Sequence, residues 1–163
     1  MELSKPFIPT DFKVPDTFQN EHFRIRMLSV NDVVKDYDAV MSSIEHLKAM
    51  YPTSSWPSKD FTFEQNLIDL GWHQKEFQMR NSFAYTVVSN DENQVLGCIY
   101  INPTTKRDYD ASITMWVRAS EVCNGLDSIL FDAVKKWISS DWPLRKVAYP
   151  GRGIDWPEWE SLN

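Results

Sequence analysis

The pattern of hydrophobic and polar residues predicts five strands. Residues 22–28 alternate between apolar and polar side chains, which is typical of a strand with one buried face. Residues 82–88 are rich in aromatic and β-branched residues, which favour strands. The polar residues 90–93 that follow predict a hairpin turn. The remaining strands are expected at 94–103, 111–120 and 145–151.

Apolar residues at helical spacing predict three helices between these strands. The first runs continuously through residues 33–51, after a cap at Ser29 with Asp32 as an imperfect capping-box partner, and Pro52 ends it. The second spans residues 63–81, where Thr62 and Gln65 form a capping box. The third spans residues 126–140. The apolar stripe expected on the second helix consists of Phe63, Leu67, Leu70 and Phe77.

The chain is expected to form one domain. Its 163 residues fit a single core, and the element order, β-α-α-β-β-β-α-β, predicts the α+β class. Residues 1–21 carry three prolines and three phenylalanines and predict an extended N-terminal lead-in tacked onto the body by its aromatic rings. Residues 22–163 then form the domain itself.

Charge and cysteine content narrow the function. The net charge is −6 and the 17 basic residues are scattered, which disfavours nucleic acid as a partner. The two cysteines, Cys98 and Cys123, and three scattered histidines show no metal-binding spacing. The chain has no long apolar segment and no signal-like N-terminus, so we expect a cytoplasmic protein with no membrane partner.

A strand, a short turn and a helix meet around Gly125. The N-terminus of a helix directs free backbone N–H groups outward and attracts anions, so this unit raises the question of a phosphate-bearing cofactor. Asp127, however, lies in the first helical turn, where a carboxylate opposes a bound anion. The segment therefore favours a cofactor fold more strongly than a working cofactor site.

These elements resemble the GNAT superfamily of N-acetyltransferases over about residues 22–150. The third expected strand contains Val95-Leu96-Gly97-Cys98-Ile99-Tyr100, similar to the leucine-glycine and tyrosine pattern of that strand in the family. The fourth ends in Met115-Trp116-Val117, similar to the apolar-Trp-Val pattern found there. The resemblance implies a mixed, mostly antiparallel central sheet flanked by helices in α/β/α layers.

The resemblance also implies that acetyl-CoA is the co-substrate and lies in a gap between the fourth and fifth strands. Trp116, Val117 and Arg118 would contact the pantetheine arm. Two residues depart from the pyrophosphate-loop pattern: Val122 replaces a basic or amide residue, and Asp127 replaces the last glycine. The loop and helix start implied to bind the cofactor comprise Cys123, Asn124, Gly125, Leu126, Asp127 and Ser128.

The catalytic residues are the least determined part of the site. Ser112 stands where the family often has a glutamate, and a serine cannot serve as that base. Asp110 and Tyr149 are weak alternatives, each also expected as an ordinary strand-end residue. The loop after the first helix offers Tyr51 and Trp56 as substrate contacts, or Trp56 as a plug between the helices.

The C-terminal end differs from the family pattern. Family members usually continue past the fifth strand with a helix and a hairpin, whereas this chain ends within twelve residues of Gly151. We expect Trp156 and Trp159 to fold back on their own domain, the alternative being a dimer interface.

Two functions follow as hypotheses. The first is an acetyl-CoA-dependent N-acyltransferase that acts on an amine of a small molecule or peptide, as a monomer or homodimer. The second is a catalytically lapsed GNAT-like fold that acts as a non-enzymatic binding module.

Overall fold

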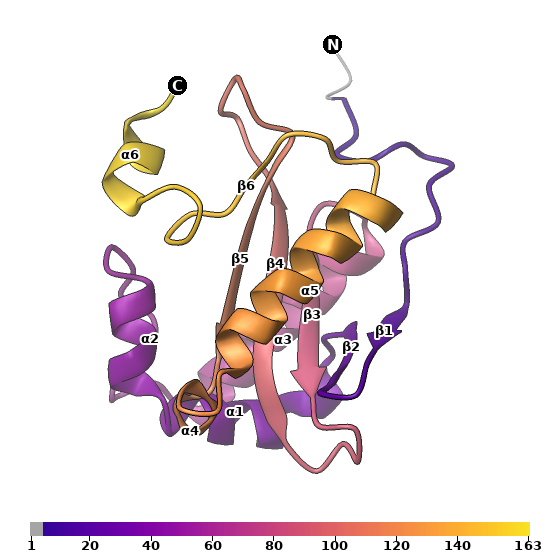
Figure 1. Ribbon diagram of the computed structural model, residues 1–163. Helices are drawn as coiled ribbons and strands as arrows, with labels where there is room; N and C mark the ends of the chain where they lie inside the picture. The colour runs from indigo at the N-terminus through magenta and orange to yellow at the C-terminus, as the bar shows by residue number, and fades with distance from the viewer. Residues whose placement is uncertain (1–4) are drawn as a thin grey trace.

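The structure is a computed structural model that describes residues 5–163, so the first four residues of the expected lead-in lie outside the described part. A six-stranded sheet runs through the centre in the order β1-β2-β3-β4-β5-β6 (Figure 1). Neighbouring strands are antiparallel except for the parallel pair β5–β6. The strands are β1 (Thr17–Gln19), β2 (Arg24–Met27), β3 (Phe83–Val88), β4 (Val95–Pro103), β5 (Ala111–Val117) and β6 (Val147–Ala148).

Helices cover both faces of the sheet, which confirms the expected α+β class and layered arrangement (Figure 1). One hydrophobic core lies between the sheet and α5, which contributes Leu130 and Val134. A second core lies on the opposite face and includes Val40 and Leu70 of α1 and α3. The helices are α1 (Val33–Met41), α2 (Ile44–Met50), α3 (Phe63–Gln78), α4 (Ala119–Val122), α5 (Leu126–Asp141) and α6 (Trp156–Ser161), with a 3-10 turn at Val30–Asp32.

The lead-in is part of the sheet and of the core. Thr17–Gln19 forms β1, a strand that the sequence pattern did not predict, and pairs with β2. Ile8 is buried, and Phe7, Phe12 and Phe18 pack against the core on the α5 face. The expected aromatic contacts between this segment and the body are therefore present.

The first expected helix is broken into α1 and α2, and tertiary contacts explain the break. Ser42 and Ser43 leave helical register, and their hydroxyls instead meet the end of β5. The Ser43 Oγ accepts a hydrogen bond from the Ala119 N–H at 2.8 Å, and the Ser42 Oγ accepts one from the Arg118 guanidinium at 3.3 Å. Both partners are far away in sequence, so local helical spacing could not predict the break.

The second expected helix is correct at its start and half correct in its stripe. The capping box between Thr62 and Gln65 is present in both directions. Leu70 is buried and Phe77 packs against the core, as expected, but Phe63 is 42% exposed and Leu67 is 39% exposed. Asn66 is buried instead, because its amide pairs with the buried Asp36.

Gly97 explains one motif of the sequence. A Cβ atom at this position would lie 2.0 Å from the carbonyl oxygen of Trp116 on β5, so no larger residue fits without moving a strand. The register of β3 against β4 also shifts at this point, between Val87 and Val88.

The C-terminal tail contacts its own chain. The Trp156 indole N–H donates to the Met50 carbonyl at 3.0 Å, and the Trp159 ring lies edge-on to Tyr109 at 5.4 Å. The Lys106 ammonium donates to the Leu162 carbonyl at 2.7 Å. The tail therefore bridges the end of α2 and the β4–β5 connection.

Arg118 is expected to be a stability determinant. The residue is 7% exposed, and its guanidinium donates to the Val95 carbonyl at 3.2 Å and to Asp38 at 3.1 Å. Arg118→Ala should lower the free energy of unfolding in urea by about 2 kcal/mol, because charged hydrogen bonds are lost and a buried carbonyl is left unpaired. Lys48→Ala is the control: Lys48 is exposed on α2, so the loss should stay below about 0.5 kcal/mol. Equal losses in the two variants would contradict this.

Candidate functional site

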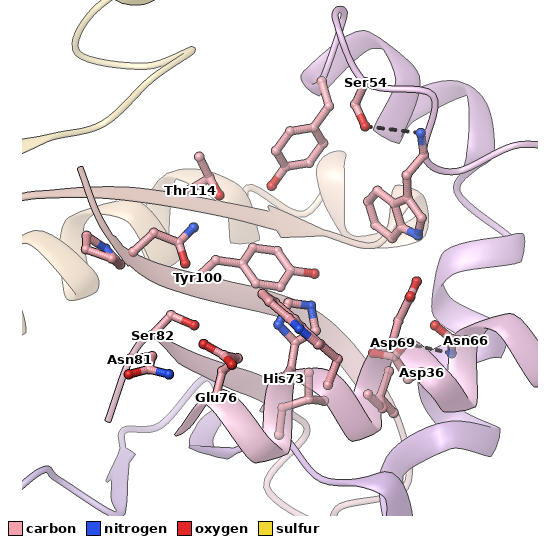
Figure 2. Close-up of a pocket in the computed structure, with 17 residues that line it drawn as sticks. Asp36, Ser54, Asn66, Asp69, His73, Glu76, Asn81, Ser82, Tyr100 and Thr114 are labelled. Atoms are coloured by element: carbon pink, nitrogen blue, oxygen red, sulfur yellow. Dashed lines mark hydrogen bonds between the residues drawn. The ribbon is translucent and has the colours of Figure 1, made fainter. Parts of the chain in front are cut away.

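A cavity of about 790 Å³ opens between the sheet and α3, on the face that α1 and α3 cover. Its size is in the range of sites for small ligands. Figure 2 shows Tyr100 and Thr114 on the strand side and Asp69, His73 and Glu76 on the helix side. The other lining residues include Leu28, Asp36, Tyr51, Ser54, Trp56, Asn66, Leu70, Trp72, Asn81, Ser82, Asn102 and Pro103.

The polar wall of the cavity follows from helical geometry. Asn66, Asp69, His73 and Glu76 are three or four residues apart on α3, so they lie on one face of the helix. The capping box at Thr62 fixes where the helix begins and therefore which face turns inward. This polar spacing is visible in the sequence, but the predicted apolar stripe does not include it, so the wall is a residue set that the sequence analysis missed.

Asp36 provides the most buried charge of the cavity. Its side chain is 3% exposed, and the Asn66 amide donates to one of its oxygens at 2.9 Å. Burial raises the pKa of Asp36 to about 6, while the hydrogen bond from Asn66 acts in the opposite direction and the charges of Asp32 and Asp69 add to the rise. Burial also raises the pKa of Asp69.

The rings of His73 and Tyr100 line the cavity between Asp69 and Glu76 (Figure 2). Their ring centroids are 5.2 Å apart. Burial lowers the pKa of His73, with an opposing effect of Glu76, so its imidazole is mainly neutral at pH 7. The Tyr100 hydroxyl accepts a hydrogen bond from the Trp116 indole at 3.1 Å, and burial raises its pKa, so the phenol stays protonated.

Tyr51 and Trp56, the expected substrate contacts, both line the cavity. Their rings are 6.1 Å apart and nearly perpendicular, and Trp56 lies 6.2 Å from the Trp116 ring. The hydroxyl oxygen of Tyr51 is buried with no hydrogen-bond partner. Burial raises the pKa of Tyr51, so its phenol stays protonated at pH 7. Trp56 thus packs against the core and also lines the cavity, and its role as a substrate contact stays a prediction.

The strand-turn-helix unit lies beside this cavity. β5 pairs with β6 only at Ala111 and Ser112, so the rest of β5 has an edge that β6 does not cover. The Trp116 and Val117 side chains are buried on opposite faces of the sheet. Arg118 turns inward to Asp38, and its backbone N–H donates to the Leu96 carbonyl, so its charge does not face the gap.

The turn before α5 has the conformation that a single glycine permits. Gly125 has a φ of 74°, in the left-handed region where side chains are disfavoured. Cys123 is exposed, and the Asn124 amide donates to Glu121 at 3.2 Å. Residues 119–122, expected to continue the strand and begin the turn, form the short helix α4 instead. Leu126 is buried, and Asp127 and Ser128 continue the first turn of α5.

Arg152 is the residue that the sequence analysis missed at this place. Its guanidinium makes two hydrogen bonds with the Asp127 carboxylate, at 2.6 and 2.8 Å, and donates to the Met115 carbonyl at 3.0 Å. It also lies 5.3 Å from the centre of the Phe131 ring. The negative charge of Asp127 is therefore neutralised by a bidentate ion pair, and the same arginine occupies part of the free edge of β5. The two residues are 25 positions apart, and no local pattern connects them.

Asp110 and Tyr149 lie outside the cavity. The Asp110 carboxylate accepts hydrogen bonds from the backbone N–H groups of Lys146 and Arg145, which lower its pKa and hold the start of β6. Tyr149 packs edge-on against Phe131 of α5 at 5.3 Å, and burial raises its pKa to about 12. β6 itself covers only two of the seven residues expected to form the fifth strand.

Residues 5–163 contain no group of three His, Cys, Asp or Glu side chains that could hold a metal ion. No helix in this range combines the length and the apolar character needed to cross a membrane. The two cysteines, one buried and one exposed, are both free.

Comparison with known proteins gives the fold. No family model and no curated protein matches the chain. A ribosomal-protein-S5-alanine acetyltransferase from Vibrio fischeri superposes with a TM-score of 0.60 and 18% identity, over 75% of this chain and 66% of that one. A putative GNAT-family acetyltransferase from Bordetella pertussis gives 0.59 and 10%, over 77% and 73%.

A third solved structure is a microcin C7 self-immunity acetyltransferase in complex with acetyl-CoA and AMP, with a TM-score of 0.57 and 11% identity, over 79% of this chain and 71% of that one. The chain thus spans about two thirds of the length of the first of these structures. The fold of the GNAT acetyltransferases, implied by the sequence resemblance, is confirmed.

The pKa of Asp36 predicts a pH-dependent effect on stability. Its folded-state pKa of about 6 lies above the ordinary value of 3.8, so its contribution to stability is full below pH 3.8 and is lost as the pH rises through 6. Asp36→Asn removes the titrating group. Between pH 4.0 and 7.5, the free energy of unfolding of the variant should therefore rise by about 2–3 kcal/mol relative to that of the wild type. Urea unfolding of both proteins at the two pH values measures this. A stability difference that is the same at both pH values would exclude the effect.

Proposed function

We propose that this chain, which has the fold of the GNAT acetyltransferases, is an acetyl-CoA-dependent N-acyltransferase that acts on an amine bound in the cavity. One observation carries the proposal: the cavity and the uncovered edge of β5 share the same strand. Thr114 lines the cavity, and the carbonyl of the next residue, Met115, points to the edge on the β6 side. An acceptor in the cavity and a donor along the edge would therefore meet across β5.

The acceptor side suits a protonated amine. Asp36, Asp69 and Glu76 contribute carboxylates, and none of the described lining residues is Lys or Arg. Aromatic faces from Trp56 and Tyr100 add favourable contacts for a cation. Such surroundings concentrate a small cation and repel an anion.

The charge along the uncovered edge of β5 suits acetyl-CoA, but the cofactor has room there only after a local movement. Arg152 neutralises Asp127, which removes the repulsion that the sequence alone implied. The same guanidinium lies against the Met115 carbonyl, so it must leave that carbonyl before a pantetheine arm can use it. The backbone of Trp116, Val117 and Arg118 and the start of α5 at Gly125–Ser128 would hold the cofactor.

The residues of the cavity would handle the protons. Acetyl-CoA supplies an activated acetyl group, and the amine must lose a proton before it can attack. His73, with its lowered pKa, is neutral at pH 7 and lines the cavity, so we assign proton removal to it. The buried Tyr51 hydroxyl has a free donor and is assigned to protonation of the departing sulfur.

A second candidate function is a non-enzymatic amine-binding protein. The specific observation in its favour is again Arg152, whose side chain is only 11% exposed and is held by Asp127, Met115 and Phe131. If this ion pair stays closed, the edge of β5 is inaccessible while the cavity remains open to a ligand.

Titration calorimetry with acetyl-CoA separates the two functions. The acyltransferase should bind acetyl-CoA with a dissociation constant below about 1 mM and release free thiol when an amine is added. His73→Gln should then lower kcat about 100-fold or more, with little change in the dissociation constant of acetyl-CoA. Absence of binding heat at millimolar acetyl-CoA would exclude the acyltransferase and leave the binding protein.

Substitutions of the two residues in the Asp127–Arg152 ion pair should change the affinity for acetyl-CoA in opposite directions. Asp127→Gly frees Arg152 to pair with the pyrophosphate and should tighten acetyl-CoA binding about tenfold or more. Arg152→Ala leaves the Asp127 carboxylate facing the anion and should weaken binding. Arg107→Ala, which removes a basic residue on the β4–β5 connection, is the matched control and should leave the affinity for acetyl-CoA unchanged. A change of this affinity in the same direction in both ion-pair variants would contradict the prediction.

A further inference from the structure

Two carboxylates on α3 stand at opposite ends of the cavity. Asp69 and Glu76 are seven residues apart, so they lie on one helix face about 10 Å apart along the axis. Figure 2 shows Asp69 beside Asp36 and Asn66 at one end, and Glu76 beside Asn81 and Ser82 at the other. The cavity therefore has two polar ends on one straight wall.

Neither carboxylate has a cationic partner within residues 5–163. The ion pairs of this part of the chain involve other acids, and the lining residues include no Lys or Arg. The end at Asp69 also carries the buried carboxylate of Asp36, whose one hydrogen-bond donor is the neutral Asn66 amide. Carboxylates that face a partly enclosed space without a counter-charge are stabilised by a bound cation.

The stretch between the two ends is aromatic and uncharged. His73 and Tyr100 stack there at 5.2 Å, and Leu70 and Trp72 add apolar surface. Because the His73 imidazole is mainly neutral, it does not repel a cationic ligand. Methylene groups can pack against these rings, whereas a third charge in the middle would lose its water without gaining a partner.

We propose that the cavity selects a linear diamine, with one ammonium group at the Asp36–Asp69 end and the other at Glu76. Two charged hydrogen bonds of about 2.8 Å subtracted from about 10 Å leave about 4–5 Å between the two ammonium nitrogens, which fits an extended alkyl chain of about three carbons. A monoamine can satisfy only one end and leaves the other carboxylate without a partner.

This inference deepens the proposed function, because it names the class of acceptor amine, and it rests on that function only for the role of the diamine as acceptor. Binding of the diamine does not require acetyl-CoA. The experiment is therefore calorimetry without acetyl-CoA, at pH 7.5 and low salt.

The first comparison uses the wild-type protein with 1,3-diaminopropane, propylamine and 3-aminopropan-1-ol. The diamine should bind at least tenfold more tightly than either monoamine, and diamines of about three carbons more tightly than those of six or eight. Equal affinities for the diamine and propylamine, or an affinity that only increases with chain length, would overturn the inference. This arm needs no variant and so does not depend on the folding of a mutant.

The second comparison uses variants of equal size and changed charge. Glu76→Gln should weaken diamine binding to the level of the monoamine, whereas Asp69→Asn should weaken it less, because the Asp36 carboxylate remains at that end. Glu76→Gln should leave propylamine binding within about twofold, because the Asp36–Asp69 end still holds one ammonium. Glu160→Gln, on the exposed surface of α6, is the matched control and should leave both ligands unaffected. Unchanged diamine affinity in Glu76→Gln would assign the second ammonium elsewhere and overturn the two-ended site.

Failure of the acyltransferase activity and failure of the diamine selectivity can be told apart. Diamine binding without thiol release from acetyl-CoA would remove the acyltransferase and keep the two-ended site. Thiol release with monoamines and diamines at equal kcat/KM would keep the acyltransferase and remove the diamine selectivity.

Discussion

Pairing of β5 with β6 ends after two residues, and the functional geometry of the molecule depends on this early separation. β5 is paired along its whole length with β4, so its position is fixed on one side. On the other side, backbone groups from Ile113 onward have no strand partner in β6 and are available to something else. In this structure the Arg152 side chain takes one of them, the Met115 carbonyl. The tail thus occupies part of the edge at which we propose that acetyl-CoA binds.

The two helical layers give the two sides of β5 different character. On the α5 face, the core is made of aliphatic and aromatic side chains, and the tail residue Arg152 meets Asp127 at its border. On the α3 face, the core is interrupted by the cavity with its carboxylates and aromatic rings. Because the buried Asp36 is paired with a neutral amide and not with a cation, its charge stays available to a ligand.

Contacts between distant segments hold this arrangement together. Ser42 and Ser43 interrupt the helix to reach Arg118 and Ala119, which fixes the end of β5 relative to α1. Trp156 donates to the Met50 carbonyl and packs against Tyr51, which joins the tail to the wall of the cavity. The tail therefore contacts both sides of the candidate site, through Trp156 at the cavity and through Arg152 at the strand edge.

Local sequence determined the elements of this protein wherever their causes are local. The alternation in residues 22–28, the capping box at Thr62 and Gln65, and the turn at Gly125 each depend on neighbours within a few positions, and each was predictable. The pattern around Gly97 indicated the fold, and its reason is the close approach of the Trp116 carbonyl. Tyr51 and Trp56 were expected near a substrate because they lie on a loop between helices.

Tertiary structure alone decided which of these residues meet. The break at Ser43, the inward turn of Asn66 and the Asp127–Arg152 ion pair all depend on partners at least 25 positions away, which no local pattern encodes. The α3 face with Asp69 and Glu76 could have been predicted from its spacing, but only the packing of α3 against β3 and α1 makes that face a cavity wall. Periodicity identifies the faces of a helix, whereas the choice of the buried face depends on the charges and volumes that the rest of the fold places opposite it.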